Sequence, residues 1–170
     1  MSFGTALLAS TCLVPSRVLA ADSGDWSSPG LAKPGDSAKY ERTASGVVYE
    51  LISTGSGDAA ARGDVVQFQY TLRRANGYFI FATIECGVGC GDGTPEVATL
   101  GKTPLIAGLE ELLTGMRPGE KRRALIPPSL GYVKDGLLPQ PPDFGQRRQV
   151  IVHASEPLVF EVRLVKVKKP

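Results

Sequence analysis

Alternating hydrophobic and polar positions predict a β-strand over Asp64–Arg74. Its apolar side chains recur at every second residue, which places them on one face of an extended chain; they are Val66, Phe68, Tyr70 and Leu72. Asn76-Gly77 follows, a pair typical of tight hairpin turns because both residues tolerate positive φ. Tyr78–Ile84 is therefore expected to return as the paired strand.

Four further segments have strand character, and one segment has the spacing of a helix. Apolar residues of Pro104–Met116 recur three or four positions apart, which gives a helix one apolar face; they are Leu105, Leu109, Leu112, Leu113 and Met116. The strands are expected at Gly46–Thr54, Glu96–Leu100, Glu120–Ile126 and Leu158–Val167. This order predicts an α+β fold, an antiparallel β-sheet wrapped around one short α-helix.

Three parts are expected along the chain. Residues 1–21 are predicted to be a targeting segment that is cleaved, because a mildly apolar run ends at small residues of the kind that a signal peptidase accepts. The alternative is a disordered apolar tail. Residues 22–44, rich in Ser, Gly, Pro and Lys, are predicted to form a flexible arm, and residues 45–168 the folded domain. No transmembrane span is expected, since a span takes about 20 apolar residues.

Composition leaves few chemical roles open. The chain has 170 residues and a formal net charge of +2, too small to require nucleic acid or an anionic membrane as a partner. Of its three cysteines and one histidine only Cys86 and Cys90 are close in sequence, whereas a zinc site needs further ligands at suitable spacing, so no metal is expected. Glu110 and Glu111 lie on the polar side of the predicted helix, where a solvated face is favoured over acid–base chemistry.

Two of the cysteines, Cys86 and Cys90, lie close together in a glycine-rich loop. In an oxidising compartment they are candidates for a small disulfide, and the alternative is two free thiols. The same glycines lack the G-x-G-x-x-G spacing and the following helix that a nucleotide-binding loop requires. The loop is therefore not expected to bind a nucleotide.

Several short motifs occur in the order found in FKBP-type peptidyl-prolyl isomerases, and from about Ser45 to Lys166 the chain resembles this family. Each motif is weak alone, but their combined order is specific. The motifs are Phe68-Gln69-Tyr70-Thr71, Asn76-Gly77, Leu105-Ile106-Ala107-Gly108-Leu109-Glu110-Glu111, Gly115-Met116-Arg117-Pro118-Gly119-Glu120-Lys121, Ile126-Pro127-Pro128, Gly131-Tyr132 and Leu158-Val159-Phe160-Glu161-Val162. The resemblance implies an FKBP-like fold with a shallow apolar pocket between helix and sheet, and no cofactor.

The resemblance also assigns pocket roles to eight residues. Those expected to carry catalysis are Tyr70, Ile106, Tyr132 and Phe160. Those expected to contact the substrate are Ile80, Phe81, Leu105 and Leu109. Two of them depart from the family pattern, because Phe81 stands where the family has an aspartate and Leu109 where it has a tryptophan. The next pocket phenylalanine of the family falls near Glu96.

A long, proline-containing loop joins Tyr132 to Leu158 and is expected to overhang the pocket. It either shapes the pocket, by narrowing it, by setting substrate choice or by offering a docking surface, or it is a tolerated surface insertion. Compact members of the family carry a shorter loop at this place.

The expected function is therefore that of a peptidyl-prolyl cis-trans isomerase, of low activity because of Phe81 and Leu109, which assists the folding or assembly of prolyl-containing client proteins. The alternative is a catalytically weak scaffold or assembly subunit of a photosynthetic membrane complex. The targeting segment, together with the resemblance to the plant and algal branch of the family, implies the thylakoid lumen of the chloroplast.

Overall fold

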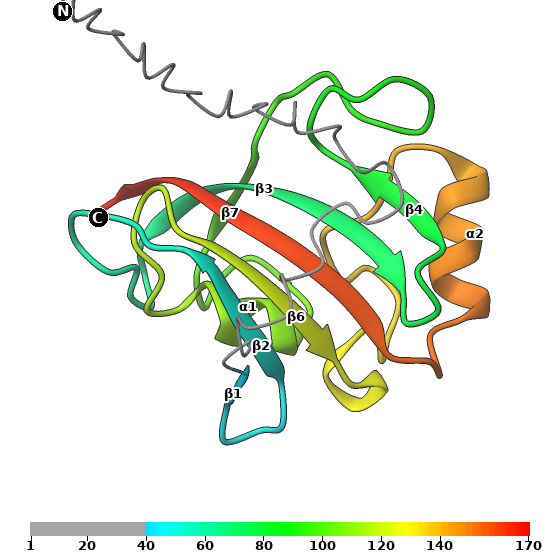
Figure 1. Ribbon diagram of the computed structural model, residues 1–170, viewed down its shortest axis with the longest axis horizontal. Coiled ribbons are helices and arrows are strands. Elements are labelled where there is room, and N and C mark those ends of the chain that lie inside the picture. The colour runs from blue at the N-terminus through cyan, green and yellow to red at the C-terminus, as the bar shows by residue number, and fades with distance from the viewer. Residues whose placement is uncertain (1–39) are drawn as a thin grey trace, which may run out of the picture. The chain divides into compact units, whose positions relative to one another are not determined.

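The computed structural model describes residues 40–170, which form one unit of helices and antiparallel strands (Figure 1). All strand pairs are antiparallel, and the strand order is β1-β2-β6-β7-β3-β4, with β5 also paired to β3. The strands are β1 Tyr40–Arg42, β2 Val48–Ser53, β3 Val65–Arg74, β4 Phe79–Ala82, β5 Glu96–Thr99, β6 Lys121–Ile126 and β7 Leu158–Lys168. The helices are α1 Ala107–Leu113, a short 3₁₀ turn Pro128–Leu130, and α2 Phe144–Val152. The predicted α+β class is confirmed.

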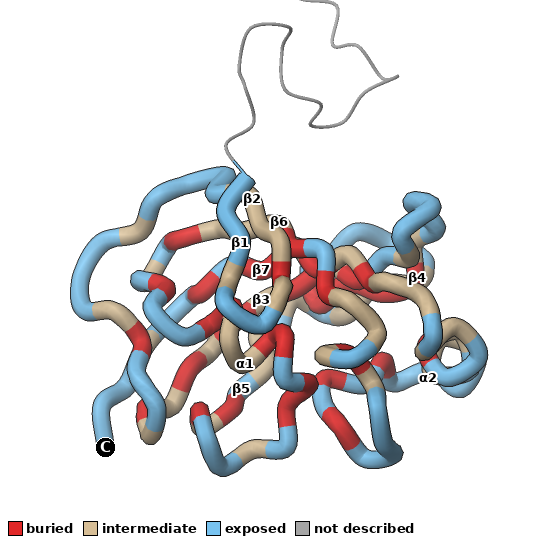
Figure 2. Tube along the Cα trace, turned by 90° about the horizontal axis from the view of Figure 1, so that it is seen from below, coloured by how far each residue is buried: buried red, intermediate tan, exposed pale blue. Residues whose placement is uncertain are grey.

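The core lies between the concave face of the sheet and α1, where the buried segments of Figure 2 converge. The central strands β3 and β7 alternate buried and more exposed positions along most of their length, as their sequence pattern predicts. On β3 the buried side chains are the four that the alternation selects, and β7 buries Leu158, Phe160, Val162 and Leu164. The apolar face of α1 covers them, so the helix and the sheet share one core.

The predicted hairpin joins β3 to β4. Gly77 adopts φ of 87°, which only a glycine accepts readily, and the Asn76 side chain accepts a hydrogen bond from the Tyr78 amide at 3.0 Å. The Arg74 and Tyr78 backbones close the turn, with an N···O distance of 2.9 Å. The register shifts at an irregularity between Leu72 and Arg73, beyond which Phe81 lies opposite Leu72.

The helix α1 is shorter than the sequence predicted. It begins at Ala107 rather than Pro104, because Leu105 pairs with Leu138 as an isolated parallel bridge and Ile106 has the extended ψ of 138°. At the other end Gly115 has φ of 84°, a conformation that stops a helix. The apolar side chains of the predicted helix are nevertheless buried on one side.

Two segments differ from the predicted organisation. Residues 40–42, placed in the flexible arm, form β1 and pair with β2. Within the long loop, Phe144–Val152 forms a second helix, α2. The Asp143 carboxylate caps its N-terminus by accepting hydrogen bonds from the backbone amides of Gly145 and Gln146. Only Val150 of α2 is buried, so the helix carries no apolar periodicity that the sequence could reveal. The predicted targeting segment and residues 22–39 of the predicted arm lie outside the described residues. Within the described residues no helix is long and apolar enough to cross a membrane.

The charged strand β6 sends its side chains to both sides of the sheet. Lys121 and Arg123 both pair with Glu161 of β7, the latter at 2.9 Å, whereas Arg122 donates to the Leu112 carbonyl of α1 at 3.0 Å. Burial raises the pKa of Glu161, but the hydrogen bonds and positive charges of its two partners outweigh burial, so that the pKa is lowered. The basic run is therefore part of the ion-pair framework of the sheet.

Candidate functional site

Seven of the eight predicted pocket residues lie in one buried cluster on the concave side of the sheet, and Tyr132 packs against it. Tyr70 of β3 forms the centre of the aromatic part. Its ring centroid lies 5.8 Å from that of Phe81 on β4 and 5.8 Å from that of Phe160 on β7. Leu109 of α1 is fully buried beneath them.

The Tyr70 hydroxyl is buried and has no hydrogen-bond partner within residues 40–170. Burial raises the pKa of Tyr70, and the nearby Tyr132 and Glu96 raise it further. In the family resemblance this hydroxyl meets an aspartate, but the side chain at that position is Phe81, whose tilted ring packs against Tyr70 and has no hydrogen-bond acceptor. The departure at Phe81 thus leaves a polar group without its partner.

The two remaining hydrogen-bond donors of the predicted site are both engaged by the long loop. The backbone N–H of Ile106 donates to the Leu138 carbonyl at 2.9 Å, and the Leu138 N–H donates to the Pro104 carbonyl at 2.8 Å. The Tyr132 hydroxyl donates to the Pro139 carbonyl. The carbonyls of Leu138 and Pro139 therefore occupy the backbone N–H of Ile106 and the hydroxyl of Tyr132, two groups of the predicted site.

Burial and hydrogen bonds hold the long loop in this position. Leu137, Pro139 and Pro141 are buried, and the peptide bond between Leu138 and Pro139 is cis. Further along, α2 packs on β4 through Val150, and the Gln146 side chain donates to the Gly89 carbonyl at 3.0 Å. The loop thus contacts the site directly and is fixed from both ends, which favours a pocket-shaping role over that of a tolerated surface insertion.

The other predicted substrate contacts, Ile80 and Leu105, are also buried, at 3% and 6% exposure. Ile80 belongs to β4 and Leu105 to the extended segment before α1. Sequence reasoning did not assign a role to Glu96, although the family comparison placed it near a pocket wall. Burial raises the pKa of this carboxyl group, and its charge reaches both Tyr70 and Tyr132.

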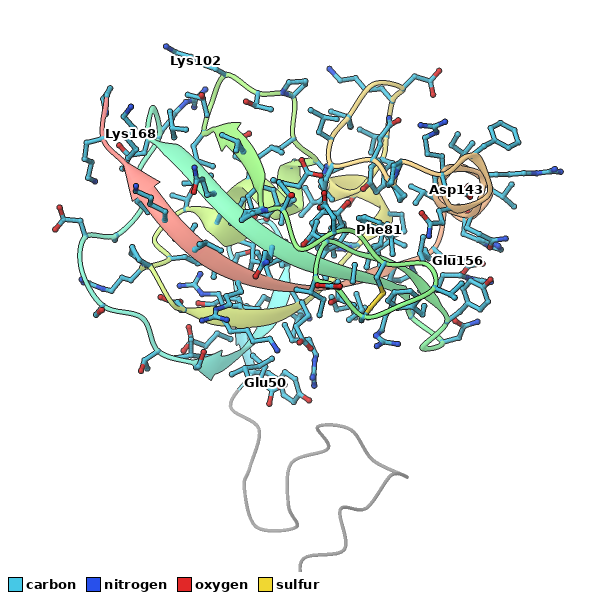
Figure 3. The ribbon with its side chains drawn as sticks, turned by 90° about the horizontal axis from the view of Figure 1, so that it is seen from above. Glu50, Phe81, Lys102, Asp143, Glu156 and Lys168 are labelled. Carbon is cyan, nitrogen blue, oxygen red and sulfur yellow. A yellow bond between two sulfur atoms is a disulfide. The ribbon has the colours of Figure 1, made fainter. Side chains whose placement is uncertain are left out.

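The glycine-rich loop contains a disulfide between Cys86 and Cys90, whose Cα atoms lie 5.6 Å apart (Figure 3). The loop also touches the pocket strands, because the amides of Gly91 and Gly93 donate to carbonyls of Ala82 and Thr83. No group of three or more metal-ligating side chains occurs in the part of the chain that the structure describes. The residues of the predicted site offer aromatic and aliphatic side chains and three hydrogen-bond donors, which are Tyr70 O–H, Ile106 N–H and Tyr132 O–H.

A family model for FKBP-type peptidyl-prolyl cis-trans isomerase matches residues 57–165, and the chain belongs to this family. In the peptidyl-prolyl cis-trans isomerase FKBP16-1, chloroplastic, of Arabidopsis thaliana, 49% of 123 aligned residues are identical, covering 72% of this chain and 58% of that protein. FKBP17-1, chloroplastic, of the same plant is 29% identical over 159 residues, or 85% of this chain and 68% of that protein. This chain thus spans less than two thirds of FKBP16-1.

Solved structures with the same fold include FkpA from Escherichia coli, with a TM-score of 0.56 and 27% identity. The alignment covers 76% of this chain and 52% of FkpA. A peptidyl-prolyl cis-trans isomerase from Pseudomonas syringae has a TM-score of 0.54 at 23% identity, covering 81% of this chain and 84% of that one. The second likeness concerns the fold alone.

Proposed function

We propose that the chain is a peptidyl-prolyl cis-trans isomerase of low basal activity, whose site is closed by its own loop. The observation that carries this proposal is the pair of hydrogen bonds by which Leu138 and Pro139 occupy Ile106 N–H and Tyr132 O–H. A prolyl segment of a client offers carbonyls of the same kind, so it competes with the loop for these donors. Displacement of the loop then opens the pocket.

The reaction needs no nucleophile. An X–Pro bond turns slowly because amide resonance sets a barrier of about 20 kcal/mol. The twisted transition state has lost much of that resonance and of the amide polarity, so an apolar pocket disfavours it less than the planar ground state. Tyr70, Phe160 and Leu109 supply this apolar environment. Ile106 N–H and Tyr132 O–H donate the hydrogen bonds that orient the peptide.

A specific observation favours the rival function, a catalytically weak scaffold on the same fold. Phe81 fills the place of a polar partner for Tyr70, and both other donors are internally satisfied. Such a protein would hold prolyl-containing clients, or a photosynthetic membrane complex, through its surface. The chloroplast names of the relatives support a chloroplast location, and the Cys86–Cys90 disulfide suits an oxidising compartment such as the thylakoid lumen.

Nuclear magnetic resonance exchange spectroscopy on a short Ala-Leu-Pro-Phe peptide separates the two functions. We expect weak acceleration of cis–trans exchange by the wild type, and about tenfold more by a variant whose residues 137–142 are replaced by glycine and serine. The matched control replaces Lys134 and Asp135, which are exposed in the same loop, and leaves the rate unchanged. Exchange at the uncatalysed rate with both the wild type and the loop variant would sink the enzyme proposal and leave the scaffold.

Fractionation of the native protein tests its location and its partners. Recovery from the thylakoid lumen is the expected result, whereas recovery from the stroma or from outside the chloroplast would contradict it. Cofractionation with an assembled photosynthetic membrane complex, resistant to moderate salt, is the outcome that the scaffold function requires. A protein recovered alone, with peptide exchange activity, favours the enzyme.

A further inference from the structure

Glu96 is the first residue of β5 and pairs with Phe68 of β3. Side chains alternate along a strand, so Glu96 lies on the same face as Ala98, which is buried at 3% exposure. Val97 between them points the other way and is 58% exposed. The Glu96 side chain therefore belongs to the concave side of the sheet, where the pocket tyrosines lie.

The surroundings of this carboxylate contain no compensating charge. Glu96 is only partly exposed, and none of the ion pairs or side-chain hydrogen bonds within residues 40–170 includes it. Its negative charge acts on Tyr70 and Tyr132, where it adds to the larger effect of burial in raising the pKa of both hydroxyls. Glu96 is thus electrostatically coupled to the two tyrosines of the predicted site.

A carboxylate that is partly removed from water is unfavourable unless a cation or hydrogen-bond donor compensates it. The loop segment that occupies the site cannot do so, because Leu137, Leu138 and Pro139 have no charged side chains. A ligand that displaces the loop and carries a cation would therefore gain an interaction that the closed state lacks. Near this position the family pattern has a phenylalanine, whose apolar ring would not distinguish a charged ligand from an uncharged one by forming an ion pair.

We propose that Glu96 makes the pocket selective for prolyl segments with lysine or arginine next to the proline. The inference rests on the proposed function, since it names the substrate class of the same pocket. A lysine or arginine stem packs along apolar walls while its cationic end reaches a carboxylate at the rim. The loop segment that closes the site is uncharged, whereas the client segment that displaces it carries a cation. This difference in charge favours basic clients over the loop.

The test uses pairs of peptides that differ in charge at one position. Ala-Lys-Pro-Phe is compared with its norleucine counterpart, and Ala-Ala-Pro-Lys with its norleucine counterpart, in the full chain. Binding is followed by chemical-shift titration and turnover by exchange spectroscopy. We expect about fivefold tighter binding of at least one lysine peptide, the factor that corresponds to an ion pair of about 1 kcal/mol.

Two variants locate the effect. Glu96→Gln keeps the shape of the side chain and is expected to abolish the preference for lysine peptides. Asp58→Asn removes an exposed charge from the β2–β3 connection and is expected to leave that preference unchanged. Equal affinity for lysine and norleucine peptides in the wild type, or a preference that survives in Glu96→Gln, overturns the inference.

The outcomes also separate this inference from the proposed function. Selective binding without accelerated exchange supports the role of Glu96 and contradicts the enzyme. Accelerated exchange without selectivity supports the enzyme and contradicts the role of Glu96. No binding of any peptide, by the wild type or by the variant with residues 137–142 replaced, overturns both.

Discussion

Replacement of Tyr70 by phenylalanine should stabilise the protein. The substitution removes one oxygen and keeps the ring, which lies 5.8 Å from Phe81 and from Phe160. That oxygen is buried without a partner in the described domain, and the full desolvation cost of such a group is about 1–3 kcal/mol. Allowing for a small void and lost dispersion contacts, we expect a net gain of about 1 kcal/mol in the free energy of unfolding.

Urea unfolding followed by intrinsic fluorescence and circular dichroism measures this change. The midpoint should rise at unchanged m-value, because the surface exposed on unfolding is almost the same. For a domain of this size a gain of about 1 kcal/mol corresponds to roughly 4 °C in Tm.

Tyr132→Phe is the matched control, since it removes the same atom from a hydroxyl that donates to the Pro139 carbonyl. It should destabilise by about 1 kcal/mol. If Tyr70→Phe also lowers stability, by an amount similar to Tyr132→Phe, then the Tyr70 hydroxyl has a partner in solution. In that case the account of Phe81 as a lost acceptor is wrong.

Three further expectations concern packing, pH and the pocket. Gly108→Ala should destabilise by about 1–3 kcal/mol in the same unfolding assay, because its Cβ would lie 2.5 Å from Ile126 Cγ2, and wild-type stability would refute the close packing. The pKa of Glu161 is lowered by its cationic partners, so its contribution is present above the unfolded pKa of about 4.3 and is lost as pH falls through the folded value. Acid titration of Glu161→Gln should therefore show a flatter loss of stability below about pH 5 than the wild type, and parallel curves would contradict the pairing. Phe81→Asp combined with Leu109→Trp should raise exchange activity and the affinity for macrolides measured by calorimetry, because it restores a polar partner and aromatic area; no gain in either would show that the loop, rather than these two side chains, limits the site.

The local sequence pattern was sufficient to predict the strands that have one buried face and one face toward water. The alternation of Phe68 and Tyr70 on β3, and of Phe160 and Val162 on β7, predicted strands whose buried faces the structure confirms. The Asn76-Gly77 turn was equally readable, since its backbone preference is a property of the residues themselves. Motif order then indicated the family to which the chain belongs.

The helix α2 was not readable from the sequence. A surface helix is usually predicted from an apolar stripe along one face. Of the residues of α2 only Val150 is buried, and Phe144 and Ile151 are 71% and 67% exposed. Its start depends on a capping carboxylate, Asp143, in a segment rich in proline. Such a segment fits a loop as well as a helix until its tertiary contacts are known.

The sequence by itself determined the central strands and the central helix, because these follow from short-range periodicity, whereas the pocket residues were predicted from the resemblance to the family. Only the tertiary structure decided what those pocket groups are bonded to. The contact of Ile106 with Leu138 joins backbone atoms distant in sequence, and backbone donors and acceptors are the same in every residue except proline. The unpartnered Tyr70 hydroxyl likewise depends on every neighbour at once, so it becomes visible only when the chain is folded.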